Sequence, residues 1–242
     1  MASDPDEEHP WAMQLAARAE KTAPPAHGAV CEAAAMAVVR LLTDPRATDG
    51  EWYDRVHRWE TARIRKVTRR ARGVRWQAVQ ELPGLTVDHD GAQVRAFVPG
   101  PVDEVPPELA RLQVAGLDLS GGGAAEPRPA PDRPYAVVAL NPDVTMTTGK
   151  AAAQSAHAAH LLLRRLGRGV REAWISAGLE VRLAGGDVPW DDCVGRSAVA
   201  VWDAGFTEVP PGTMTAVAWL LPPGPPLPRG TGDRARGLPS RG

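Results

Sequence analysis

Two short stretches of the sequence hold polar residues at spacings that suit catalysis. The first, GKAAAQSAHAA, places Lys150, Gln154 and His157 at positions i, i+4 and i+7. This spacing puts the three side chains on one face of a helix predicted over 148–165. The neighbouring residues are mostly Ala and Leu, so the polar face either lines a cleft or meets other polar groups in the core.

Lys150 would lie in the first turn of that helix, where free backbone N–H groups and the helix dipole attract anions. Only three of the 28 basic residues are lysines, so the chain uses lysine sparingly and arginine freely. A compact ammonium at this position favours a functional role. The alternative is an exposed lysine, with Gln154 and His157 satisfied by packing.

The second stretch, DAGFTEVPPGTMT, follows a predicted strand at 198–202 and begins with Asp203. Thr207 and Thr215 come four and twelve residues later. Ligands of open α/β sheets gather beyond the carboxyl ends of strands. A carboxylate and two hydroxyls there could orient a water or an ester, although Asp-Ala-Gly after a strand can equally be a plain turn.

Taken together, the two stretches resemble the type-2 peptidyl-tRNA hydrolases of archaea, eukaryotes and some bacteria. That family carries GKxAAQxxHA at the start of a helix and DAGxTxxxPGxxT between two strands, and every fixed position is met here. The resemblance covers about residues 134–223.

The resemblance implies a small four-stranded mixed sheet flanked by helices, usually in a homodimer, with no metal or organic cofactor. It implies hydrolysis of the ester that joins a peptide to the tRNA 3′ ribose. By the family's pattern the site residues are Asp203, Lys150, Gln154, Thr207 and Thr215. We expect the aspartate to act as general base or to orient water, and the lysine to stabilise an oxyanion or phosphate. His157 ranks below these, as a residue lining the site or packing on the helix.

One feature departs from the family's pattern. A helix of several turns normally precedes the DAG motif, whereas 184–197 (AGGDVPWDDCVGRS) is rich in Gly and Asp and predicts no good helix. One face of the sheet would then need cover from the N-terminal region or from a second subunit.

The rest of the chain divides by composition. We expect a disordered N-terminus over 1–26, a mostly helical region with a short β-hairpin over 27–119, and a Gly/Pro linker over 120–134. The α/β domain follows over 135–223, with strands at 135–140, 179–183, 198–202 and 215–221, and a disordered tail over 224–242. In the N-terminal region we expect helices over 30–43, 51–72 and 106–113, and a hairpin over 85–98 turning at Asp90-Gly91.

The predicted helix over 51–72 is strongly basic. The segment 51–76 holds nine basic residues against three acidic ones, interspersed with Trp and Tyr. Such a helix could hold RNA phosphates and stack on bases, with Arg65, Lys66, Arg69 and Arg70 as the RNA-binding candidates. A solvated basic face whose tryptophans pack inward explains the same pattern.

Composition sets the remaining limits. The net charge is −1, so any attraction to nucleic acid is local, and two distant cysteines predict neither a disulfide scaffold nor a zinc site. No apolar run is long enough to span a bilayer, which predicts a soluble, cytoplasmic protein. The leading hypothesis is a peptidyl-tRNA hydrolase, and the alternative is a non-catalytic RNA-binding or regulatory protein built on the same domain.

Overall fold

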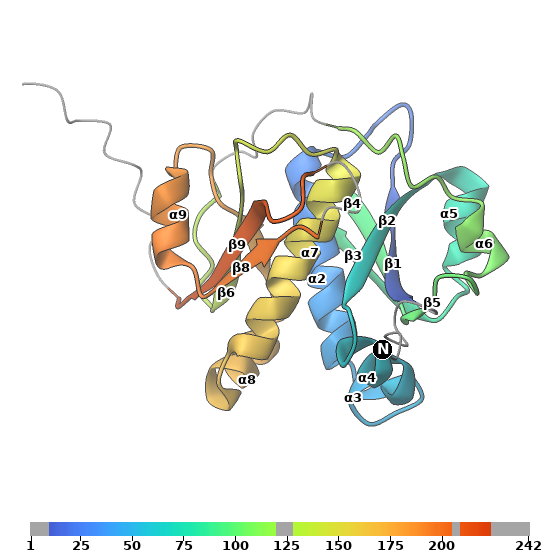
Figure 1. Cartoon of the computed structure of the whole chain (residues 1–242), viewed down its shortest axis with the longest axis horizontal. Helices are drawn as coiled ribbons and strands as arrows, with labels where there is room; N and C mark the ends of the chain where they lie inside the picture. Colours follow the sequence, from blue (N-terminus) through green and yellow to red (C-terminus); the bar gives the residue numbers. More distant parts are fainter. Residues whose placement is uncertain (1–9, 120–127, 205–208, 224–242) are drawn as a thin grey trace, which may run out of the picture.

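The structure is a computed structural model that describes residues 10–119, 128–204 and 209–223. It is an α/β fold with two mixed sheets, separated by a layer of two long helices (Figure 1). The predicted α/β class with a four-stranded mixed sheet is confirmed for the C-terminal half. Among the described residues, no helix is long and apolar enough to cross a membrane.

The C-terminal sheet follows the sequence-based expectation closely. Its strands are β6 (Tyr135–Leu140), β7 (Val181–Leu183), β8 (Val199–Trp202) and β9 (Met214–Leu221), in the order β7-β6-β9-β8. Helices α7 (Thr148–Arg165) and α8 (Arg168–Ser176) connect the first two strands. The run YAVVAL is covered on both faces, because Ala136 and Val138 point to α7 while Val137 and Ala139 point to the opposite side.

The segment 184–197 corrects one expectation, because it does contain a helix, α9 (Trp190–Arg196). Asp191 and Asp192 lie in its first turn, where they stabilise the positive end of the helix dipole. Cys193 is buried against the outer face of the sheet together with Tyr135. The low helix propensity of Gly and Asp is therefore outweighed by the placement of the two aspartates at the helix N-terminus and by the packing of Cys193.

The N-terminal half differs from the expectation of a mostly helical region. It contains β1 (Trp11–Arg18), β2 (Arg65–Ala71), β3 (Gly84–His89), β4 (Ala92–Phe97) and the short β5 (Gly100–Pro101). Its helices are α2 (His27–Thr43), α3 (Pro45–Thr48), α4 (Tyr53–Glu60), α5 (Gly73–Val79) and α6 (Pro107–Ala110). The sheet order is β2-β1-β4-β3, with β5 pairing β1.

Two predictions for this half are wrong. The disordered N-terminus predicted over 1–26 contains β1, whose residues are almost all buried in the middle of a sheet. The helix predicted over 51–72 ends at Glu60, and β2 follows it because Arg65–Ala71 pairs in parallel with β1 along its whole length. Long-range pairing here overrides local helical propensity.

The β-hairpin lies where the sequence predicts it. Asp90 and Gly91 both have positive φ, at 47° and 77°, as a tight two-residue turn requires. The tail predicted over 224–242 and most of the linker predicted over 120–134 lie outside the described residues.

The two sheets share one topology. In each, the first strand pairs in parallel with the second and antiparallel with the fourth, and the third pairs antiparallel with the fourth. The helices also correspond, with α2 and α7 following the first strand and α5 and α9 following the second. The chain therefore contains the same fold twice; we call these halves the N-terminal and C-terminal repeats.

A matched pair of side chains supports the correspondence. Trp59, near the end of α4, donates its indole N–H to the carbonyl of Arg65 at 3.1 Å. Trp174 of α8 donates to the carbonyl of Glu180 at 3.0 Å, with the same sequence separation. Both indoles are fully buried, each just before the second strand of its repeat.

The repeats pack against each other through their long helices. Helix α2 lies along α7, α7 also contacts β2, and α2 also contacts β7. One apolar core contains Leu15 and Ala17 of β1 together with Ala136 and Val138 of β6. The inner face of the C-terminal sheet is thus covered by α7 and by α2 of the other repeat (Figure 1).

Candidate active site

Three of the predicted site residues meet at the start of α7. The ammonium of Lys150 forms an ion pair and hydrogen bond with Oδ2 of Asp203. The side-chain amide of Gln154, one turn along the helix, donates to the same oxygen at 2.6 Å. An ammonium, an amide and a carboxylate thus converge on one point, brought together from segments about fifty residues apart.

Local structure fixes both sides of this cluster. Helix α7 begins at a cap in which the Thr147 hydroxyl accepts a hydrogen bond from the backbone N–H of Lys150 at 3.3 Å. Asp203 directly follows β8. Its N–H donates to the carbonyl of Thr213 at 2.9 Å, and its own carbonyl accepts from the N–H of Gly212 at 2.8 Å. Gly212 has φ of 76°, a conformation that favours glycine.

The cluster is largely shielded from water. The side chain of Lys150 is 13% exposed and that of Asp203 is 6% exposed. Electrostatic interactions are stronger in such surroundings than in bulk solvent. A carboxylate held by two donors in this setting can orient a water molecule, and the adjacent ammonium can stabilise negative charge that develops nearby.

Of the two candidate threonines of the second motif, the structure describes only Thr215. Thr215 is fully buried at the start of β9, and its hydroxyl donates to the carbonyl of Val201 at 3.4 Å, two residues before Asp203. Its hydroxyl therefore bonds β8 in this structure. Thr207 lies outside the described residues.

His157 lies on the predicted face of α7, one turn beyond Gln154, and is half-buried. Burial, followed by the electrostatic effect of the neighbouring Lys66, His160 and Lys150, lowers the pKa of His157 to about 2. The ring is therefore neutral and weakly basic near neutral pH, which fits a packing role rather than that of the general base.

The proposed RNA-binding set lies on the strand β2 and not on a helix. Lys66 is directed into the interior, where its ammonium donates to Nδ1 of His160 at 3.1 Å and lies over the Trp59 ring. His160 in turn donates from Nε2 to Glu60 at 2.7 Å. Burial lowers the pKa of Lys66 to about 7 and raises that of Glu60.

The arginines of this set are also engaged with the protein. Arg69 bonds the side chain of Gln14 at 2.9 Å and the carbonyl of Leu112 at 3.1 Å. Arg70 bonds the carbonyl of Gly116 at 2.9 Å and the side chain of Gln113. Arg65 lies at the start of the strand, also engaged with the protein. The prediction that these four cations lie on a basic helix is therefore wrong.

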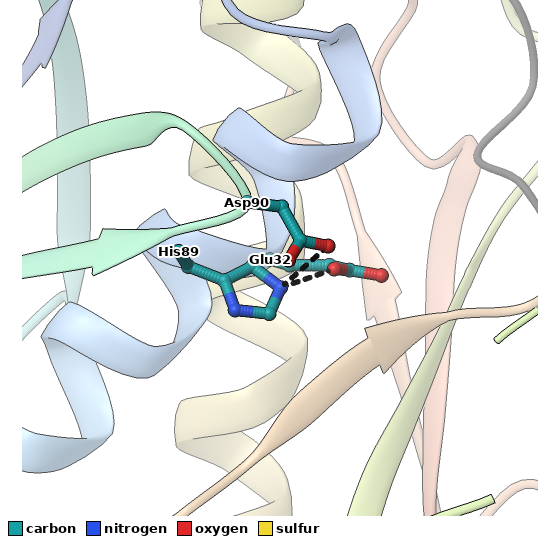
Figure 2. A group of neighbouring side chains, drawn as sticks. All are labelled: Glu32, His89 and Asp90. Atoms are coloured by element: carbon teal, nitrogen blue, oxygen red, sulfur yellow. Dashed lines mark hydrogen bonds and ion pairs between the residues drawn. The ribbon is translucent and has the colours of Figure 1, made fainter. Parts of the chain in front are cut away.

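Sequence reasoning missed a polar cluster at the corresponding place in the N-terminal repeat. Glu32 lies in the second turn of α2, as Gln154 does in α7, and Asp90 directly follows β3, as Asp203 follows β8. Figure 2 shows Glu32, His89 and Asp90 directed toward one another. His89 donates to Glu32 at 2.6 Å.

These three side chains have a geometry that could hold a metal ion, but they already bind a cation. The Arg128 guanidinium donates to both oxygens of Glu32 at 2.6 Å and forms an ion pair with Asp90. The backbone N–H of Leu183 also donates to Glu32, at 2.8 Å. Burial alone would raise the pKa of Glu32, but the hydrogen bonds from His89, Leu183 and Arg128 outweigh it and lower the pKa. The cluster therefore joins α2 to the other repeat as a saturated network.

No protein-family model matches the chain, and the search of curated proteins gives no significant match. The likeness to the type-2 peptidyl-tRNA hydrolases accordingly depends on the two motifs and on the geometry of their residues.

Proposed function

We propose that this protein is a peptidyl-tRNA hydrolase, which cleaves the ester between a peptide and the 3′ end of tRNA and so recycles the tRNA. The observation that carries the proposal is the convergence of Lys150 and Gln154 on one carboxylate oxygen of Asp203. These are three of the six fixed polar positions of the two motifs, and they come from the two segments that the family pattern pairs.

In the proposed reaction, Asp203 orients a water molecule and accepts its proton as the water oxygen attacks the ester carbonyl carbon. The ammonium of Lys150 stabilises the negative charge that develops on the carbonyl oxygen. The carbon–oxygen bond to the ribose then breaks, and the protonated Asp203 returns its proton to the leaving 3′ oxygen. Gln154 holds the Asp203 carboxylate through its amide, Thr215 braces the end of β8 through its bond to Val201, and Thr207 is assigned to positioning the ester and the water. In this scheme the reaction is carried out by side chains of the protein, without a metal or organic cofactor. The proposed partner is tRNA, and the proposed compartment is the cytoplasm.

The test is release of tRNA from N-acetyl-aminoacyl-tRNA by the purified chain. We expect catalytic release above the spontaneous rate of ester hydrolysis. Tight tRNA binding without turnover would overturn the hydrolase proposal in favour of a non-catalytic RNA-binding protein. The small exposed fractions of the Lys150 and Asp203 side chains are the observation that favours this second candidate, since a covered ion pair can serve structure alone.

A further inference from the structure

The N-terminal repeat has a concave, strongly basic surface. A hollow of about 580 Å³ lies where β1 and β2 end, lined among others by Glu20, Lys21, Arg70, Arg72, Arg75 and Gln113. Four of these six side chains are cations and one is an anion. In a chain with a net charge of −1, this is a local concentration of positive charge.

The single carboxylate does not neutralise the hollow. Glu20 is already bonded by the backbone N–H of Gly73 at 3.1 Å and by Arg18, outside the hollow, at 3.0 Å. These two hydrogen bonds lower the pKa of Glu20, so it stays charged, but its charge is offset by Arg18. The four cations of the hollow are therefore left in excess.

Two of the cations are held in place and two have no fixed partner. Arg70 is anchored on Gly116, and Arg75 donates to the carbonyl of Arg111 at 3.2 Å. The side chains of Lys21 and Arg72 are exposed and make no hydrogen bond or ion pair with the residues that the structure describes, although the charge of Arg72 contributes to the lowered pKa of Glu20. Two fixed cations and two exposed cations around one concave surface can each contact a different phosphate. This arrangement favours binding of a polyanion whose phosphates lie several ångströms apart.

The hollow is connected to the candidate active site by a short segment. Gln113 lines the hollow, and from there the chain runs to Leu117, whose carbonyl accepts from the N–H of Gly149 at 3.0 Å. Leu119 then donates its N–H to the Thr148 hydroxyl at 2.8 Å, at the first residue of α7. Six residues span at most about 20 Å, so the hollow and the start of α7 are no further apart than a few nucleotides of RNA.

Figure 1 shows the same relation, with the loop after β1, the end of β2 and the start of α7 at one edge of the molecule. Ligands of open α/β sheets bind at the carboxyl ends of their strands, and the hollow occupies that position in the N-terminal repeat. The candidate active site occupies the corresponding edge of the C-terminal repeat.

We propose that this hollow binds the phosphate backbone of an RNA strand whose 3′ end reaches the Lys150–Asp203 cluster. The identification of that RNA as tRNA rests on the proposed function. The N-terminal repeat, in this view, holds the RNA body and the C-terminal repeat acts on its end.

The test compares two double variants that each remove two exposed positive charges. Lys21→Gln with Arg72→Gln changes the hollow, and Arg165→Gln with Arg168→Gln changes the far end of α7 and the start of α8. The dissociation constant of fluorescently labelled, deacylated tRNA is measured by anisotropy at several salt concentrations. Because no ester is present, this measurement is independent of hydrolysis.

We expect the hollow variant to bind about tenfold more weakly, with a salt slope smaller by about 2, and the control variant to bind as wild type does. Equal weakening in both variants, or none in the hollow variant, would overturn the proposal, as would absence of tRNA binding by the wild type. If instead the hollow variant weakens binding while neither it nor the wild type releases tRNA from its ester, the hollow stands and the hydrolase proposal falls.

Discussion

Replacement of Asp203 by asparagine tests the chemistry of the site with almost no change of shape. From the described residues, the carboxylate accepts hydrogen bonds from the ammonium of Lys150 and from the amide of Gln154. The amide that replaces it would keep one acceptor oxygen but would lose the charge and the capacity to accept a proton. Both turnover and stability should therefore respond.

The expected magnitudes follow from the structure. Loss of a general base lowers turnover by about 10²- to 10⁴-fold. Hydrogen bonds to charged groups contribute about 1.5–3 kcal/mol, and the low exposure of this pair leaves little solvent screening. We therefore expect the substitution to lower the free energy of unfolding by an amount in that range. The substitution should thus reduce activity far more than it reduces the folded fraction.

The assay is single-turnover release of N-acetyl-aminoacyl groups from tRNA, with chemical denaturation measured on the same preparations. Asp191→Asn in the exposed first turn of α9 is the control, because it removes the same charge away from the cluster. Turnover by Asp203→Asn at the wild-type rate would refute the assignment of Asp203 as base. A loss of stability without loss of turnover would mark the ion pair as structural.

Three further predictions concern the interior. Because burial lowers the pKa of Lys66 to about 7 in the folded protein against its ordinary 10.5, the unfolded chain binds more protons between these values, and stability should rise with pH across that window. Lys66→Met should flatten this rise in pH-dependent denaturation; an unchanged rise would contradict the burial argument. Trp59→Phe and Trp174→Phe should each cost about 1–3 kcal/mol by loss of matched hydrogen bonds, and Trp202→Phe, on a 60% exposed side chain, close to nothing in the same denaturation assay. Different costs for the two buried tryptophans would weaken their equivalence. Burial raises the pKa of the Cys31 thiol to about 12, so iodoacetamide at pH 8 should modify this residue only after unfolding, as peptide mass spectrometry would show.

The C-terminal repeat could be predicted well because its signals are local. The apolar run at 135–140 and the capped helix starting at Thr148 coincide with β6 and α7. The pairing of Lys150 with Asp203 followed from the motif resemblance, since neither residue alone specifies its partner. His160 was missed as a site of polar contact because its partners, Glu60 and Lys66, lie about one hundred residues away.

The N-terminal repeat was harder to predict because its structure depends on distant pairing. The β2 sequence RKVTRRA is polar enough to pass for the continuation of a helix, and only its parallel partner β1 makes it a strand. The repetition was hidden because the two halves share strand order rather than residues. One signal of the repetition is present in the sequence. Trp59 and Trp174 each lie six residues before the residue whose carbonyl they bond, Arg65 and Glu180, at or directly before the start of the second strand of each repeat.

The repeated topology has a consequence for how such a chain can change over time. Two copies of one fold on a single polypeptide are present in a fixed one-to-one ratio and meet through α2 and α7 without a concentration-dependent association step. Substitutions in one copy need not appear in the other, as they must in a symmetric pair of identical chains. The Glu32–Arg128 network and the Lys150–Asp203 pair show such divergence at matching places, so each copy is able to specialise independently.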